Sequence, residues 1–183
     1  RGPELAGRVG LSIRLIRIIA DTSLVWIRSK APLFGQLISQ KNYKKLESIF
    51  WKNLRSSLIF TIIGYIFLNV LVLYLNYYNY EIINRLMHPK SILYLSISFS
   101  LNAIIIGCSY YLRAHKTEPF LLPTIVGSLF SLIIALISFS YFDEIVFSIF
   151  LLINTIFSSL LWCGYIFIKD RRKILSQNFK NEI

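Results

Sequence analysis

The chain has 183 residues, of which 55% are hydrophobic, and it carries 20 Lys plus Arg against 9 Asp plus Glu. A soluble domain of this length would show amphipathic helices with one polar face, and long uncharged runs exclude that class here. The excess of Lys and Arg does not indicate a nucleic-acid partner, because these residues are distributed along the chain as the positive-inside rule predicts for a membrane protein. Cys108 and Cys163 lie in apolar stretches, and we assign them no role.

The first predicted helix, residues 5–28, is long enough to cross a bilayer but carries a narrow charged stripe. At about 100° per residue, four of its five charged residues, Arg14, Arg17, Asp21 and Arg28, lie within about 60° of one another, whereas Arg8 points well away from them. Each ionised residue at the centre of a membrane helix costs about 2.5 to 3.5 kcal/mol. The stripe therefore cannot face lipid, and ionisable residues inside a membrane are candidates for function.

Two placements of this first helix fit the charge pattern. The helix either crosses the membrane with its stripe turned into a bundle interior, or lies on the cytoplasmic face with its arginines toward lipid phosphates. We favour crossing, because Arg14 and Arg17 occupy the middle of the segment and Asp21 is an i,i+4 partner for Arg17. The stripe is also narrower than the polar face of an interfacial helix.

Four further runs contain no Asp, Glu, Lys or Arg and approach or exceed the roughly 20 residues that span a bilayer. They cover residues 56–80, 91–112, 119–142 and 145–168. Since these runs are apolar nearly all round, we predict transmembrane helices. The expected fold is an all-α integral membrane bundle of about five helices, forming a single membrane domain over residues 1–183.

The basic residues predict the orientation of these helices. Most of them lie in the connection 31–55, in the turn after residue 112 and in the tail 169–183. They are Lys41, Lys44, Lys45, Lys52, Arg55, Arg113, Lys116, Lys169, Arg171, Arg172, Lys173 and Lys180. The positive-inside rule places these segments and the C-terminus in the cytoplasm, where we expect contact with anionic membrane lipids.

The connection 31–55 is predicted to be a cytoplasmic loop between the first two helices. Pro32 and Gly35 are expected to interrupt the first helix, and an amphipathic patch follows from Tyr43 to Phe50. The only methionine is Met87. We therefore expect the chain to begin part way through a larger protein.

Three stretches of the chain form a recognisable set. They start at Glu4 (Glu-Leu-Ala-Gly-Arg-Val-Gly-Leu-Ser-Ile-Arg-Leu-Ile-Arg), at Val25 (Val-Trp-Ile-Arg-Ser-Lys-Ala-Pro-Leu-Phe-Gly-Gln-Leu, with Lys45-Leu downstream) and at Tyr111 (Tyr-Leu-Arg-Ala-His-Lys-Thr-Glu-Pro-Phe). Together they resemble the C-terminal part of a bacterial polysaccharide flippase. The family is the O-antigen (Wzx-type) branch of the superfamily that includes the multidrug and toxin extrusion (MATE) transporters. The resemblance implies a fold of twelve helices in two six-helix lobes. This chain would cover the last five helices, and the N-terminal lobe would be missing.

The resemblance also implies a function, which is the translocation of oligosaccharide linked to a polyprenyl diphosphate across the bacterial cytoplasmic (inner) membrane. Its product would be lipopolysaccharide O-antigen or a related surface polysaccharide. Arg14 and Arg17 are the leading candidates to bind the diphosphate, because a guanidinium gives forked hydrogen bonds to phosphate and stays protonated when buried. Asp21 would either hold an arginine in place when the cavity is empty or serve as a proton or cation site, and we favour the first. Arg28 would lie near the cytoplasmic mouth.

Simpler interpretations of the same residues stay open. In one alternative, Arg17 and Asp21 form a purely structural pair that fixes the helix to a neighbouring helix. In another, the Arg28 side chain only extends to the lipid head groups. The alternative function is a non-transporting membrane subunit or scaffold whose arginines pair with a partner helix. The sequence has no zinc-protease, Cys-x-x-Cys, Walker or dinucleotide-binding pattern. We therefore expect no enzyme activity, cofactor or metal.

Overall fold

The computed structural model describes residues 3–141 and 143–180, and these are helical almost throughout. The elements are α1 (Pro3–Ser23), α2 (Val25–Arg28), α3 (Ala31–Ser39), α4 (Tyr43–Tyr77), the 3-10 helix η1 (Glu81–Arg85), α5 (Pro89–Ala114), α6 (Leu121–Tyr141), α7 (Glu144–Thr155), the π-helix η2 (Ile156–Cys163) and α8 (Gly164–Lys180). No strand occurs in the described residues. The all-α class is confirmed.

Four helices among the described residues are long and apolar enough to cross a membrane, judged by length and composition. They are Tyr43–Tyr77, Pro89–Ala114, Leu121–Ser138 and the continuous helix Glu144–Ser176 made of α7, η2 and most of α8. These helices contain most of the four uncharged runs of the sequence, so the chain has the character of a helical membrane protein. The charged α1 is not among the four, and its crossing of a membrane stays a prediction.

The connection 31–55 is helical rather than an irregular loop. Pro32 lies in the first turn of α3, where its missing N–H removes no hydrogen bond from the helix. Gly35 lies in the middle of α3, where an added Cβ would meet nothing within 4 Å. Residues 43–55 form the beginning of α4, so this long helix joins the basic segment to the apolar one.

The predicted ends of two other segments also differ from the structure. The tail beyond residue 168 continues as α8 to Lys180, because nothing in this segment breaks the helix after the π-helical turns. The third uncharged run, residues 119–142, forms α6, which begins at Leu121 and not at residue 119. Phe142, which ends that predicted run, and residues 181–183 of the tail lie outside the described residues.

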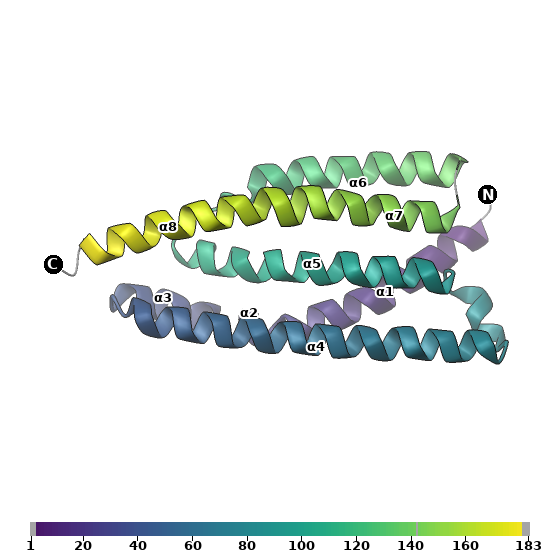
Figure 1. The fold of residues 1–183 in the computed structure, drawn as a ribbon, viewed down its shortest axis with the longest axis horizontal. Helices are drawn as coiled ribbons and strands as arrows, with labels where there is room; N and C mark the ends of the chain where they lie inside the picture. The colour runs from purple at the N-terminus through teal and green to yellow at the C-terminus, as the bar shows by residue number, and fades with distance from the viewer. Residues whose placement is uncertain (1–2, 142, 181–183) are drawn as a thin grey trace.

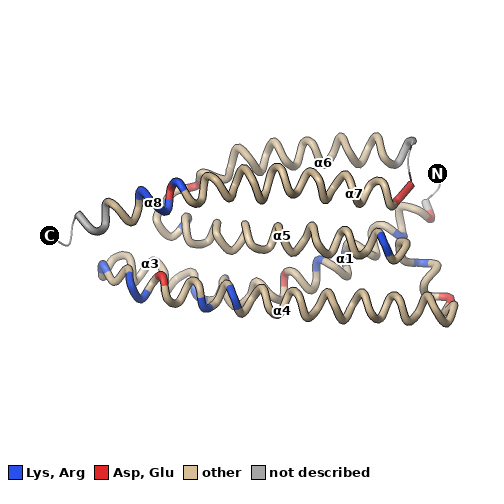
Figure 2. Tube along the Cα trace, in the orientation of Figure 1, with Lys and Arg blue, Asp and Glu red and all other residues tan. Residues whose placement is uncertain are grey.

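The long helices lie side by side, and α1 crosses them obliquely on its way from the N-terminus to α2 and α3 (Figure 1). Lys and Arg gather at one end of the bundle, around α3, the beginning of α4 and α8, and they also follow α1 (Figure 2). We call this end the basic end. The opposite end carries the N-terminus, η1 and the turn between α6 and α7.

The helix α1 packs antiparallel along the apolar part of α4. Thr61 Oγ1 donates a hydrogen bond to Ser23 Oγ at 2.7 Å, and the Tyr65 hydroxyl donates one to the Ile16 carbonyl at 3.2 Å. The two helices approach so closely at Gly64 that an added Cβ would lie 2.6 Å from Cγ2 of Ile19. The helix α1 therefore lies beside the uncharged segment of α4, and not across its end.

Candidate functional site

The four predicted site residues lie on one face of α1 and α2 that points away from the other helices. The opposite face of α1 is buried against α4 and α5 by Ser12, Ile16, Ala20 and Ser23. The side chains of Arg17, Asp21 and Arg28 are 73%, 48% and 42% exposed, and Arg14 is exposed as well. The sequence led us to expect the stripe inside a bundle, but within this chain it faces outward.

Asp21 holds two of the three arginines of the stripe. Its Oδ2 lies 3.5 Å from Arg17 Nε, which is the expected i,i+4 pair, and its Oδ1 accepts a hydrogen bond from Arg28 Nη2 at 3.1 Å. Arg14 makes no hydrogen bond or ion pair with any residue in 3–141 or 143–180. The stripe thus has three positive charges and one negative charge, with one guanidinium unpaired within the described chain.

The surface around the stripe is open. An added Cβ at Gly7 or Gly10 would meet nothing within 4 Å, and Leu11 and Ile18 of the same helix are large exposed hydrophobic residues. A face that mixes glycine, exposed aliphatic side chains and unpaired charge is costly in lipid. It therefore requires water, a ligand or another helix over it.

A second charged cluster lies at the basic end, where Glu47 of α4 meets Arg171 of α8. Arg171 donates two parallel hydrogen bonds to this carboxylate, from Nε to Oε1 at 3.2 Å and from Nη2 to Oε2 at 2.7 Å. The Tyr111 hydroxyl donates to Oε1 at 2.7 Å, and Trp51 Nε1 donates to Oε2 at 3.0 Å. The Arg171 guanidinium also lies 5.4 Å from the ring centroid of Trp51. We call this cluster the Glu47 clamp.

The Glu47 clamp is largely covered, with the side chains of Glu47 and Arg171 only 19% and 32% exposed. Burial alone would raise the pKa of the Glu47 carboxyl, but the hydrogen bonds from Arg171 and Tyr111 and the charge of Arg171 lower it below its usual value. The carboxylate thus stays ionised and joins α4, α5 and α8. Four satisfied hydrogen bonds leave it little capacity for a ligand, so we assign the clamp a structural role.

Sequence reasoning did not single out the Glu47 clamp. Its one visible signal is an acidic residue, Glu47, within a segment otherwise rich in lysine. Its partner Arg171 is 124 residues away, in a tail whose basic residues predict the orientation of the helices and contact with anionic lipids. Helical periodicity cannot show a contact between segments so far apart.

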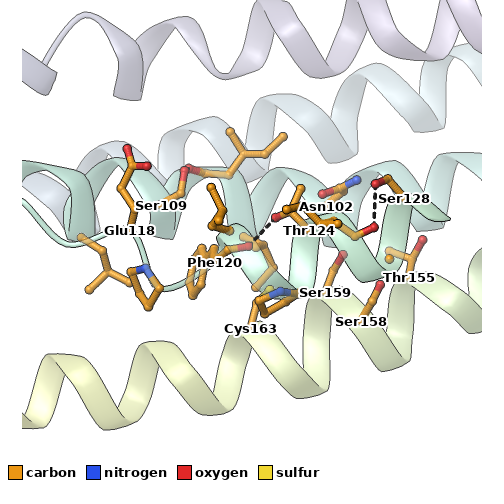
Figure 3. A pocket seen from close by; sticks show the side chains of 18 of the residues that line it. Asn102, Ser109, Glu118, Phe120, Thr124, Ser128, Thr155, Ser158, Ser159 and Cys163 are labelled. Carbon is orange, nitrogen blue, oxygen red and sulfur yellow. Dashed lines mark hydrogen bonds between the residues drawn. The ribbon is translucent and has the colours of Figure 1, made fainter. Parts of the chain in front are cut away.

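A groove of about 630 Å³ lies between α5, α6 and η2. It exists because α5 and α6 each pack on α7 and η2 but scarcely on each other. Figure 3 shows hydroxyl and amide side chains from these elements around it, among them Asn102, Thr124, Ser128 and Ser159. Among the described residues, Arg113 and Glu118 are the only charged ones in its lining, and they lie at the basic end and pair with each other at 3.5 Å.

The π-helical turns of η2 form one wall of this groove. A π-helix is rare, and its wider turns occur often at functional sites. Asn154, just before it, donates both amide hydrogens to α6, to the Gly127 carbonyl at 3.1 Å and to Ser131 Oγ at 2.8 Å. This amide ties the beginning of the π-helix to α6.

Comparisons with protein-family models, with curated proteins and with solved structures find no match to this chain.

Proposed function

We propose that this chain is the C-terminal part of a transporter that moves polyprenyl-diphosphate-linked oligosaccharide across the bacterial cytoplasmic membrane for the synthesis of O-antigen or a related surface polysaccharide. The observation that carries the proposal is the open charged stripe on α1, a helix packed beside the uncharged segment of α4. The flippase resemblance of the stretches that begin at Glu4 and Val25 supports the same cargo.

The chemistry of the stripe suits this cargo. A diphosphate and its sugars cannot be solvated by hydrocarbon, so a transporter must offer polar groups while the lipid tail stays in the bilayer. Arg14, unpaired within the described chain, is free to give forked hydrogen bonds to phosphate oxygens. Arg17 meets Asp21 through its Nε atom at 3.5 Å, which is a long contact that a diphosphate of higher negative charge would displace.

In this proposal Asp21 positions the arginines of the empty site. Its carboxylate lies between Arg17 and Arg28 and holds both side chains along the stripe. Like charges would otherwise repel one another. When the diphosphate arrives, Arg14 and Arg17 turn to it, and Arg28 stays near the basic end with Asp21.

The remaining partners follow from the same resemblance. An N-terminal lobe would face the stripe and close a polar path between the two lobes, and membrane lipids would surround the apolar faces of α4 and α6. The second candidate function is a scaffold, in which acidic residues of a partner helix neutralise Arg14 and Arg17. The exposed stripe of α1 supports the scaffold function as well, and the two functions differ in whether a diphosphate or a partner helix covers the stripe.

The deciding experiment replaces both Arg14 and Arg17 with Gln in the complete protein and measures surface polysaccharide at matched expression. We expect the polysaccharide to be lost, because the diphosphate then has no forked donor. Arg172→Gln is the matched control, since Arg172 is an exposed arginine of α8 and belongs neither to the stripe nor to the lining of the groove, and it should leave the polysaccharide unchanged. Normal polysaccharide in the double variant would refute the proposal. Loss of polysaccharide together with loss of a co-purifying membrane protein would favour the scaffold.

A further inference from the structure

The groove between α5, α6 and η2 has the size of a ligand site. Pockets for small molecules and cofactors enclose about 300 to 1,000 Å³, and this groove encloses about 630 Å³. Its lining residues Asn102, Ile125 and Ser128 are exposed, so the groove opens sideways from the bundle. It is separate from the charged stripe, none of whose four residues lines it.

Three polar side chains in the groove have unused hydrogen-bonding capacity. Asn102, Tyr110 and Ser159 line it and make no hydrogen bond with any residue that the structure describes. Other polar side chains of the lining are already engaged, as in Ser158, whose hydroxyl donates to the Asn154 carbonyl at 2.7 Å. The amide of Asn69, in another uncharged run, is likewise used, since it donates to Ser96 Oγ at 3.1 Å.

The position of Asn102 in the fold makes it costly to leave its side-chain amide without a hydrogen-bond partner. It lies in the middle of α5, far from both ends of a helix that is apolar enough to cross a membrane. An amide without a hydrogen-bond partner at membrane depth costs several kcal/mol. A ligand that both donates and accepts hydrogen bonds would remove this cost.

The ligand that fits is uncharged. In the part of the chain that the structure describes, Tyr110 and Cys163 are the only ionisable side chains in the interior of the groove, and the two charges at its mouth, Arg113 and Glu118, neutralise each other. A phosphate would find no free cation here. Asn102 offers one acceptor and two donors, whereas Tyr110 and Ser159 offer hydroxyls that serve as either. Aromatic rings of Tyr110 and Phe120 supply apolar surface beside them.

The groove is too short for a membrane-spanning helix. Its lining runs from the mouth at the basic end only as far as Asn102, Ser131 and Asn154. Beyond Ser131, Ile134 and Ala135 of α6 pack into the same apolar cluster as Leu95 of α5 and Phe147 of α7. This cluster closes the space between the helices, so an occupant must fit within half the length of the bundle.

We propose that this groove binds the uncharged, hydroxyl-rich headgroup of a glycolipid, which enters sideways from the bilayer and hydrogen-bonds to Asn102, Tyr110 and Ser159. Sugar hydroxyls both donate and accept hydrogen bonds, which are the two capacities that Asn102, Tyr110 and Ser159 leave unused. The site does not depend on the proposed transport function, because it uses no residue of the charged stripe.

The test uses the purified chain in nanodiscs that contain a monoglucosyl diacylglycerol, with diacylglycerol alone as the comparison, and measures retained lipid by native mass spectrometry. We expect retention of the glucolipid over diacylglycerol. Asn102→Leu should weaken this retention by roughly tenfold, and Ser159→Ala should weaken it less. Asn76→Leu is the matched control, since Asn76 is an exposed helical asparagine outside the groove, and it should have no effect.

Folding is checked separately, since Asn102→Leu adds an apolar side chain to an exposed position and should not lower the unfolding temperature. Equal retention of both lipids, or equal retention by Asn102→Leu and by the unaltered chain, would overturn the proposal. Competition then identifies the source of the headgroup. Displacement by octyl glucoside but not by methyl glucoside assigns the site to a membrane-embedded glycolipid, and displacement by both supports a site for the sugar itself. Loss of both α1 arginines should change neither result.

Discussion

Arginine pairs with a carboxylate both in the Glu47 clamp and in the stripe of α1, and these two regions differ in how completely the protein covers the paired side chains. In the Glu47 clamp, one carboxylate accepts four hydrogen bonds from three side chains and is 19% exposed. In the stripe of α1, Asp21 pairs with Arg17 and Arg28, and the side chains of these three residues are 42% to 73% exposed. Covered pairs are part of the fold, whereas open pairs remain available for exchange with a ligand.

This difference separates a structural use of charge from a proposed functional one. Removing one partner of a buried pair leaves an uncompensated charge, which is strongly destabilising. Exposed pairs contribute little to stability because water competes for both partners. The two regions should therefore respond in opposite ways, with the Glu47 clamp affecting stability and the stripe affecting binding.

The largest effect on stability is expected from Glu47→Ala. It leaves the Arg171 guanidinium and the Tyr111 hydroxyl without their acceptor, at a cost of about 2 to 3 kcal/mol. Unfolding in mixed detergent micelles, followed by tryptophan fluorescence, measures this loss. Glu118→Ala removes the exposed carboxylate that pairs with Arg113 and should change stability by less than about 0.5 kcal/mol. Equal effects of the two substitutions would contradict the structural role of the clamp.

An intermediate effect is expected from acid. Because the pKa of Glu47 is lowered in the folded protein from an ordinary value of 4.5, its ionisation stabilises the fold above about pH 4.5. This stability is lost as the pH falls through the lower pKa of the folded state, with a slope of up to about 1.4 kcal/mol per pH unit. Unfolding measured at a series of acidic pH values should show a smaller slope for Glu47→Gln than for Glu118→Gln. An unchanged slope in Glu47→Gln would mean that another carboxylate carries the acid sensitivity.

The smallest effect on stability is expected from Arg17→Gln. Its contact with Asp21 is long and open to water, so the free energy of unfolding should change by less than about 0.5 kcal/mol. Binding of farnesyl diphosphate in micelles, used as a short polyprenyl diphosphate probe, should nevertheless fall, because the stripe loses one of its two proposed phosphate donors. A large loss of stability would instead support the structural interpretation of the Arg17 and Asp21 pair.

Much of the fold was predictable because it depends on local composition. Runs without charge and near 20 residues in length must be buried in an apolar medium, and the structure has long helices in those places. The stripe was also predictable, since helical periodicity alone places Arg14 and Arg17 on the same side as Asp21. The helical state of residues 31–55 was not predictable. A proline interrupts a helix when it lies in the interior but is tolerated in the first turn, and only the structure shows that Pro32 lies in the first turn of α3.

The Glu47 clamp and the groove are not predictable from local patterns either, because both depend on which helices meet. The Glu47 clamp joins residues 124 positions apart, and the groove exists only because α5 and α6 both pack on η2 and leave space between them. A list of polar residues in the sequence would include Asn69, Asn102 and Asn154 without distinction. Only the packing shows that Asn69 and Asn154 are bonded to neighbouring helices while Asn102 is not.

The sequence by itself determined that the chain is helical, that four of its helices are apolar enough to span a membrane, and that charge is concentrated on one side of the first. These properties follow from side-chain hydrophobicity and helical geometry, which act over a few turns. Tertiary structure decided which charges are covered, which polar groups are left without partners, and that the stripe of α1 faces outward while its other face packs on α4. Those outcomes depend on contacts between distant segments, and no local pattern encodes them.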